Sequence, residues 1–194
     1  QRALNSHGVS DAWLVVDPSH ATPETHVFAS KGALHERTTL TTAGCASLID
    51  ATQVKRHFHG AMQKAGLAVA EIGLIPCTGV LSWLLEAKQR RVMSLLAVDT
   101  LPTTAIGAAG LGTLSELRAC IDAADVLMQS RAIAEQMLYM VTEISYEEAV
   151  ALTTLELAST LQLELGSRLV VIVEDGPGGS VSSGCESLKG TDDG

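Results

Sequence analysis

Aromatic residues and positive charges are scarce in this sequence. Its 194 residues include two Trp, two Tyr and two Phe, and 13 Lys and Arg stand against 22 Asp and Glu, for a net charge of −9. So few aromatic side chains leave no platform on which nucleic-acid bases could stack. An acidic surface also repels phosphate backbones, so we expect no nucleic-acid partner.

Long apolar runs and paired cysteines are missing as well. No apolar stretch reaches the roughly 18 to 20 residues that a membrane helix needs, and the first residues lack the basic and apolar regions of a signal peptide. The four cysteines show neither CxxC nor zinc-type spacing, which favours free thiols in a reducing compartment. No thiol or carboxylate recurs at ligand spacing around the histidines. We expect a soluble cytoplasmic protein with no membrane contact and no metal site.

What the sequence does have is enough apolar material for one large core. Hydrophobic residues make up 46% of it and charged residues only 18%, which predicts a single domain over residues 1–175. The Gly- and Ser-rich residues 176–194 cannot pack and are expected to form a flexible tail. So apolar a chain also favours a partner that covers part of its surface, so we expect an oligomer of identical or different chains.

The order of predicted elements is typical of an α/β fold with a mostly parallel or mixed sheet. Capping-box patterns at Thr113/Glu116 and Ser145/Glu148 mark two helix starts. The strands are apolar throughout rather than alternating, which predicts helices on both faces of the sheet. The expected strands are 12–16, 70–75, 92–98 and 169–173, and the main expected helices are 46–65, 113–139 and 145–165.

Several segments between residues 58 and 177 resemble the condensing enzymes of the thiolase fold, most closely the chalcone-synthase-like (type III) polyketide synthases. The similar segments, in chain order, are AMQKAGLAVAEIGLIPCTGV at 61–80, IGAAGLG at 106–112, VTEI at 141–144 and GSRLVVIVEDGP at 166–177. The resemblance implies the amino-terminal half of a thiolase-like fold. It implies an acyltransferase activity on an acyl-CoA or carrier-protein thioester, with no further cofactor.

Two departures weaken that activity. Ala108 or Ala109 stands where the family has its nucleophilic cysteine, and the family's catalytic histidine and asparagine belong to a half that this sequence does not contain. Without a thiolate and an imidazole to activate it, condensation has no machinery. We therefore expect a degenerate or partial condensing domain that is not catalytic alone.

Two other cysteines are alternative nucleophiles. Cys45 lies in TTAGCASLIDA, residues 41–51, which resembles the nucleophile turn of elongating ketosynthases and starts a predicted helix. Cys77 ends a predicted strand, in a loop that lines the acyl pocket of the resembled family. For both, a small buried thiol is the simpler interpretation.

A ligand site is expected where the loops 76–80 and 105–112 meet, because substrates bind at the carboxyl ends of parallel strands. Small residues there leave room for an acyl group, and hydroxyl groups can orient it. The predicted substrate-binding residues are Thr78, Gly79, Thr104, Ala108 and Gly110.

Two further functions stay open. One is a non-enzymatic subunit of an assembly, whose long helix 113–139 forms a protein interface. The other is a Rossmann-like domain that binds a small ligand, with the glycine-rich turn 107–112 at a nucleotide phosphate.

Overall fold

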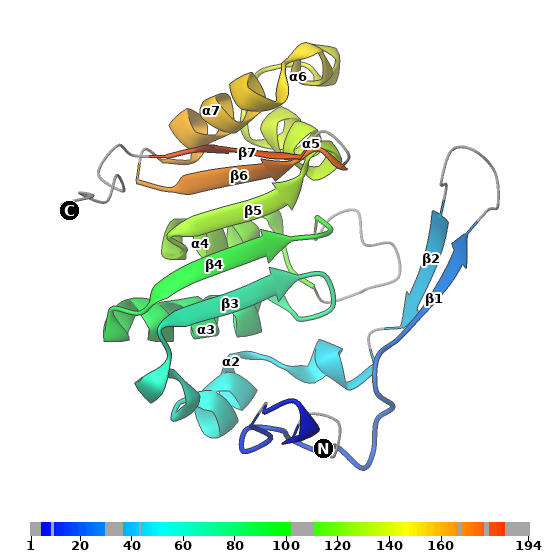
Figure 1. Cartoon of the computed structure of the whole chain (residues 1–194), viewed down its shortest axis with the longest axis vertical. Helices are drawn as coiled ribbons and strands as arrows, with labels where there is room; N and C mark the ends of the chain where they lie inside the picture. Colours follow the sequence, from blue (N-terminus) through cyan, green and yellow to red (C-terminus); the bar gives the residue numbers. More distant parts are fainter. Residues whose placement is uncertain are drawn as a thin grey trace.

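A five-stranded, mostly parallel sheet forms the centre of the protein (Figure 1). The computed structural model describes residues 5–8, 10–29, 37–42, 44–101, 111–166, 168–176 and 179–184. Neighbouring strands follow one another in the sequence, the first four are parallel, and the last is antiparallel to its neighbour. This confirms the predicted α/β class. The strands are β3 (Leu67–Ile72), β4 (Met93–Val98), β5 (Val126–Ser130), β6 (Val170–Glu174) and β7 (Ser180–Ser183).

The helices that connect these strands pack on one face of the sheet, which we call the covered face. Helix α3 (Cys77–Arg90) links β3 to β4, and α4 (Leu114–Ala123) links β4 to β5. Three helices lie between β5 and β6, namely α5 (Arg131–Val141), α6 (Tyr146–Ala151) and α7 (Thr154–Leu165). One apolar core joins them to the sheet, and its largest buried side chains include Ile72, Leu84, Leu96, Ile121, Leu127, Leu138 and Leu161.

The opposite face of the sheet, which we call the open face, carries no helix in the described part of the chain. On β3 the two faces differ sharply, because Ala68 and Ile72 are buried whereas Leu67 and Val69 are 50% and 57% exposed. The sequence predicts helices on both faces, and the described helices cover one.

The amino-terminal region forms a separate, small sheet. Strands β1 (Glu24–Ala29) and β2 (Arg37–Thr42) pair antiparallel and lie apart from the five-stranded sheet (Figure 1). Residues 12–16, predicted as a buried strand, are exposed and form no strand, so that prediction is wrong. An apolar run becomes a strand only beside another strand, and none is described next to it.

The single helix predicted over residues 46–65 is replaced by short pieces, so that prediction is wrong too. The Asp50 side chain accepts a hydrogen bond from Gln53 N, which begins a new helix inside the predicted one. A turn at His59 and Gly60 divides the segment again, and a Cβ at Gly60 would lie 2.7 Å from the Trp13 ring. The pieces are η1 (Gly44–Leu48), α2 (Ala51–Gln53), η2 (Val54–Phe58) and η3 (Ala61–Lys64).

The long helix predicted over residues 113–139 is wrong as well, because β5 divides it. Its predicted start is confirmed, with Thr113 and Glu116 forming a capping box. Asp125 then accepts hydrogen bonds from Ser94 N and Oγ at 2.8 and 2.9 Å. These bonds attach the start of β5 to β4, and no local pattern predicts them.

The helix predicted from Ser145 to Leu165 is two helices. The capping box of Ser145 and Glu148 is confirmed, and a second one, made by Thr153 and Glu156, begins α7. At the carboxyl end, Ser180–Ser183 of the predicted tail pairs with β6 as β7. Within the described residues no helix is both long and apolar enough to cross a membrane.

Candidate functional site

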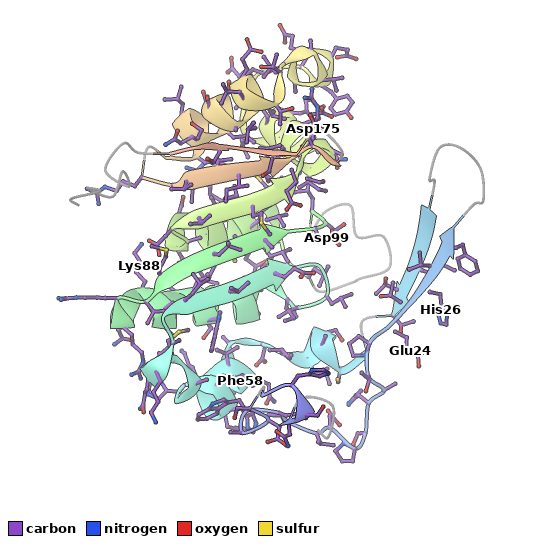
Figure 2. The ribbon with its side chains drawn as sticks, in the orientation of Figure 1. Glu24, His26, Phe58, Lys88, Asp99 and Asp175 are labelled. Carbon is purple, nitrogen blue, oxygen red and sulfur yellow. The ribbon has the colours of Figure 1, made fainter. Side chains whose placement is uncertain are left out.

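Polar side chains gather where the parallel strands end. Glu71 lies near the end of β3, Asp99 follows β4, Ser130 ends β5 and Glu174 ends β6. Parallel strands bring their carboxyl ends to the same edge, and the register pairs Ser130 directly with Glu174. Figure 2 shows Asp99 at this edge, with Asp175 farther along it. Such an edge is where open α/β sheets bind their ligands.

A hollow of about 330 Å³ lies at this edge, and we call it the edge hollow. Its polar side chains include three carboxylates and one hydroxyl, and Ala97 and Met128 provide apolar floor on the open face of the sheet. This volume falls at the lower end of the range of small-molecule sites. The residues that line it are Glu71, Ala97, Val98, Asp99, Met128, Gln129, Ser130 and Glu174.

Gln129 is the most unusual of these residues. It lies between Val98 and Val173 in the register, is only 2% exposed, and neither Nε2 nor Oε1 of its side chain has a hydrogen-bond partner. An unpaired buried amide costs about 1–3 kcal/mol. Such groups are rare in folded proteins, and alternation along β5 places this amide on the covered face, with Val98 and Val173.

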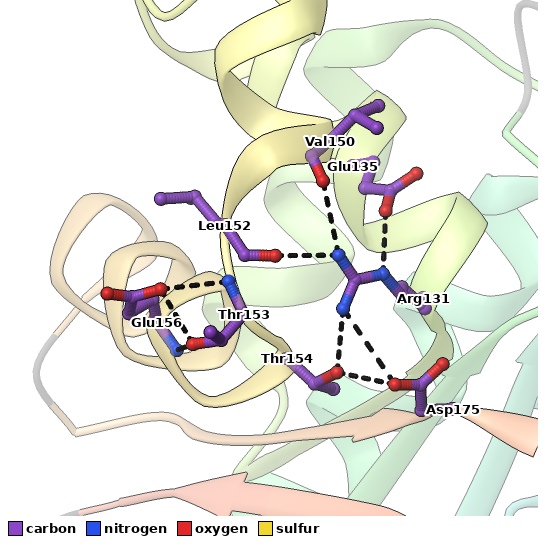
Figure 3. A network of polar contacts seen from close by, with 8 residues as sticks. All are labelled: Arg131, Glu135, Val150, Leu152, Thr153, Thr154, Glu156 and Asp175. Carbon is purple, nitrogen blue, oxygen red and sulfur yellow. Dashed lines mark hydrogen bonds and ion pairs between the residues drawn. The ribbon is translucent and has the colours of Figure 1, made fainter. Parts of the chain in front are cut away.

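An arginine network holds this part of the sheet edge in place (Figure 3). Arg131, the first residue of α5, donates to Glu135 Oε1 at 2.8 Å, to Thr154 Oγ1 at 2.7 Å and to the Leu152 carbonyl at 2.6 Å. Thr154 Oγ1 in turn donates to Asp175 Oδ2 at 2.6 Å, directly after β6. The planar guanidinium thus ties the start of α5 to the start of α7 and to the end of β6.

The sequence-predicted residues of the 76–80 segment lie in a helix rather than a loop, so the loop prediction is wrong. Cys77, Thr78 and Gly79 form the first turn of α3, with Thr78 exposed and the other two buried. A Cβ at Gly79 would lie 1.9 Å from the Ile49 carbonyl oxygen, so only glycine fits there.

The predicted meeting of this segment with the 105–112 turn is seen at its last two residues. Cys77 N donates to the Leu111 carbonyl at 2.6 Å, and a Cβ at Gly112 would contact the Cys77 thiol. Thr104, Ala108 and Gly110, the other predicted substrate-binding residues, lie outside the described residues.

Neither cysteine that was an alternative nucleophile lines the edge hollow. Cys45 is half-buried in η1, away from the sheet edge. Cys77 is fully buried in the core beside Cys120, whose thiol also donates to the Cys77 carbonyl. A hydrogen bond between the two thiol side chains lowers the pKa of Cys77, and the same bond and burial raise the pKa of Cys120. Both thiols are therefore part of the apolar core.

Sequence reasoning missed the residues that form the edge hollow. The sequence prediction took Asp99 only as the residue that ends a strand, and it did not name Glu71, Ser130 or Glu174 as site residues. A signal was present, because each apolar strand ends in or beside a polar residue. Seeing it required β5, which had been assigned to a helix.

Comparison with known proteins identifies the fold. No protein-family model and no curated protein matches the sequence. Among solved structures, a ribokinase from Cryptococcus neoformans var. grubii serotype A in complex with ADP has a TM-score of 0.67 at 14% identity. A ribokinase from Thermotoga maritima has a TM-score of 0.64 at 15% identity, and a Burkholderia thailandensis nucleoside kinase in complex with inosine has 0.61 at 16%. The fold is therefore the α/β fold of ribokinase-like proteins.

The likeness covers almost all of this chain and about half of each solved structure. The three matches cover 94%, 95% and 94% of this chain, and 54%, 52% and 50% of the ribokinase from C. neoformans, that from T. maritima and the nucleoside kinase, respectively. The chain thus spans about half the length of the solved structures that it matches.

These matches overturn the resemblance to thiolase-fold condensing enzymes. The interpretations as a polyketide-synthase-like acyltransferase and as a degenerate condensing domain are wrong. A helix end, a glycine, an apolar strand and a loop of small residues recur in any parallel α/β fold, so the similar segments reflect that alternation. The alternative of a Rossmann-like domain that binds a small ligand agrees better with the fold.

Proposed function

We propose that the edge hollow binds a small, neutral molecule rich in hydroxyl groups, of the sugar or nucleoside class. The observation that carries the proposal is the convergence of three carboxylates and a hydroxyl at the carboxyl ends of β3 to β6. Polar groups that converge on an apolar floor are the usual composition of a small-molecule site.

The charge of the hollow favours hydroxyl groups over phosphates. Glu71, Asp99 and Glu174 are hydrogen-bond acceptors when ionised, and a sugar hydroxyl can donate to each of them. The same carboxylates would repel a phosphate group.

The solved structures of the same fold support this ligand class. One of them is a nucleoside kinase in complex with inosine, and two are ribokinases. Because of this likeness, we also propose that the whole protein is a small-molecule kinase. In that kinase, the edge hollow would be part of the site that binds the phosphate acceptor. A cytoplasmic location remains a prediction.

Thermal unfolding with added ligand tests the binding proposal. A ligand that binds only the folded state raises Tm, and at 100 times its Kd it stabilises the fold by about 2.7 kcal/mol. We expect D-ribose or inosine to raise Tm, and inorganic phosphate not to do so. Glu174→Gln and Asp99→Asn should weaken the binding at least tenfold, because each leaves a ligand hydroxyl without its charged acceptor.

Glu147→Gln is the matched control, since Glu147 is exposed on α6, away from the sheet edge. It removes the same charge and should leave the affinity unchanged. If neither D-ribose nor inosine changes Tm, or if all three variants bind equally well, the edge hollow is not the site.

A further inference from the structure

Both tyrosines of the chain lie on one surface, where helices α5 and α6 meet. Tyr139 of α5 is 53% exposed, and Tyr146 of α6 is 43% exposed. Their rings contact each other edge to face, with 6.4 Å between the ring centroids. Val150 comes four residues after Tyr146, so it lies on the same side of α6, and it is 44% exposed. We call Tyr139, Tyr146 and Val150 the tyrosine patch.

A hollow of about 730 Å³ lies beside the tyrosine patch, and we call it the acidic hollow. It forms where the segment between the two tyrosines passes from α5 into α6. Met140, Val141 and Ile144 give it an apolar lining, and the end of α7 contributes Glu164. Its volume is within the range of cavities that hold a drug-sized ligand, so it has room for a large side chain of a partner.

The segment that forms this surface carries charge of one sign. Residues 132–167 contain six Glu and no Lys, Arg or His. Three of these carboxylates, from Glu143, Glu148 and Glu164, line the acidic hollow. Glu147 is exposed on α6. Within the described residues, no hydrogen bond or ion pair reaches the side chains of Glu143, Glu147 and Glu164. The rim of the surface therefore offers carboxylates with which the cations of a partner can pair.

We propose that the tyrosine patch and the acidic hollow bind a basic amphipathic helix of a partner protein. The apolar side of that helix packs on the two rings and on Val150, and one of its large apolar side chains enters the hollow. Its Lys or Arg side chains pair with the carboxylates of the rim, and a cation can also lie on the face of a tyrosine ring. Aromatic side chains at the centre of a polar rim are typical of protein interfaces.

The charge of the surface also decides among possible occupants. Carboxylates repel the phosphates of nucleic acids and of anionic lipids, so neither matches this surface. In a twofold dimer, a second copy of this chain would bring the same carboxylates opposite each other. The basic residues Lys55 and Arg56 belong to η2, which lies at the opposite end of the molecule from α6 (Figure 1). A basic segment of another protein is therefore the better match.

A synthetic amphipathic helix, with Leu on one side and Lys on the other, tests the proposal. We expect it to bind the chain of 194 residues, measured by fluorescence anisotropy, and to bind at least tenfold more weakly at high salt, because ions screen its charges. The same peptide with Glu in place of Lys should not bind. Amide hydrogen exchange should slow in residues 139–150 when the Lys peptide binds, and it should stay unchanged in α3.

Substitutions then locate the binding. Tyr146→Ser removes one ring of the patch and should weaken the affinity for the Lys peptide at least tenfold. Leu85→Ser is the matched control, since Leu85 is 51% exposed on α3, and it should leave the affinity unchanged. Glu143→Gln should weaken the affinity about threefold and reduce its dependence on salt. Glu24→Gln, at an exposed site on β1, should do neither. Circular dichroism shows whether each variant is folded.

Four results would overturn the proposal. The Lys peptide could fail to bind, the Glu peptide could bind equally well, or Tyr146→Ser and Leu85→Ser could lose the same affinity. Self-association of the chain that Tyr146→Ser abolishes, measured by sedimentation, would assign the surface to a second copy instead. The acidic hollow shares no lining residue with the edge hollow, so each of these results leaves the binding of D-ribose or inosine to be judged separately.

Discussion

The two faces of the five-stranded sheet differ although their strands have similar composition. On the covered face, Leu96, Leu127 and Val171 pack under α3 to α7 and are inaccessible to solvent. On the open face, Leu95, Val126 and Val170 lie in the same strands and stay partly exposed. Apolar residues on both faces of a strand therefore predict that both faces are buried. Only the tertiary structure shows which face the helices of this chain cover.

Neighbouring residues of β5 give the largest expected contrast between the faces. Leu127→Ala should cost about 2–5 kcal/mol of unfolding free energy, because it empties a site in a closed core. Met128→Ala, one residue away on the open face, should cost about 1 kcal/mol or less. Urea unfolding of both variants of residues 1–194 measures the contrast. Equal losses would mean that the open face is already packed.

The arginine network is expected to come next in size. Arg131→Met keeps the apolar stem but removes the donors to Glu135, Thr154 and the Leu152 carbonyl. We expect a loss of about 2 kcal/mol, since these bonds are only partly shielded from water. Arg56→Met, at an exposed site on η2, is the control and should change stability little. Equal losses of unfolding free energy in the two variants would show that the arginine network does not stabilise the sheet edge.

Gln129 should behave in the opposite way. Gln129→Met removes two unpaired polar atoms from a buried site with little change of volume, so the free energy of unfolding should rise by about 1–2 kcal/mol. Gln136→Met on α5 is the control, because Gln136 is half-buried and absent from the edge hollow. A loss of stability would show that the amide has a partner in the folded protein.

The smallest effect concerns pH. Hydrogen bonds from the Ser145 backbone and hydroxyl lower the pKa of Glu148, and the Thr153 hydroxyl and backbone do the same for Glu156. Groups whose pKa falls on folding stabilise the protein above their unfolded pKa of 4.5, and that contribution is lost as pH falls through the folded pKa. Tm should therefore fall slightly more between pH 5 and about 3 than it does in the double variant Glu148→Gln, Glu156→Gln. If Tm falls equally with pH in the unsubstituted chain and in the double variant, the pKa values of Glu148 and Glu156 are not lowered by folding.

Local signals predicted the parts of the fold that depend on neighbours in sequence. The capping boxes at Thr113 and Ser145 begin helices as expected, and the apolar runs 92–98 and 169–173 are strands. These elements are defined by hydrogen bonds within four residues or by unbroken apolar segments, so a sequence pattern is sufficient for them.

Predictions failed where a distant contact decides the outcome. Residues 126–130 fit a helical pattern, but hydrogen bonds between Asp125 and Ser94 place them beside β4 as a strand. The edge hollow could not be found without that strand, because Ser130 and Met128 belong to it. The resemblance to condensing enzymes failed for a similar reason, since similar local segments can be joined into different folds.

The sequence by itself determined the α/β class, the mostly parallel sheet and the helix starts at Thr113 and Ser145, because periodicity and capping act over a few residues. Only the tertiary structure decided the order of the strands, the ribokinase-like fold and the meeting of Glu71, Asp99, Ser130 and Glu174 at one edge. It also decided which face of the sheet the helices cover. Side chains from four strands come together only when crossover connections align those strands, and that alignment depends on packing between residues far apart in the chain.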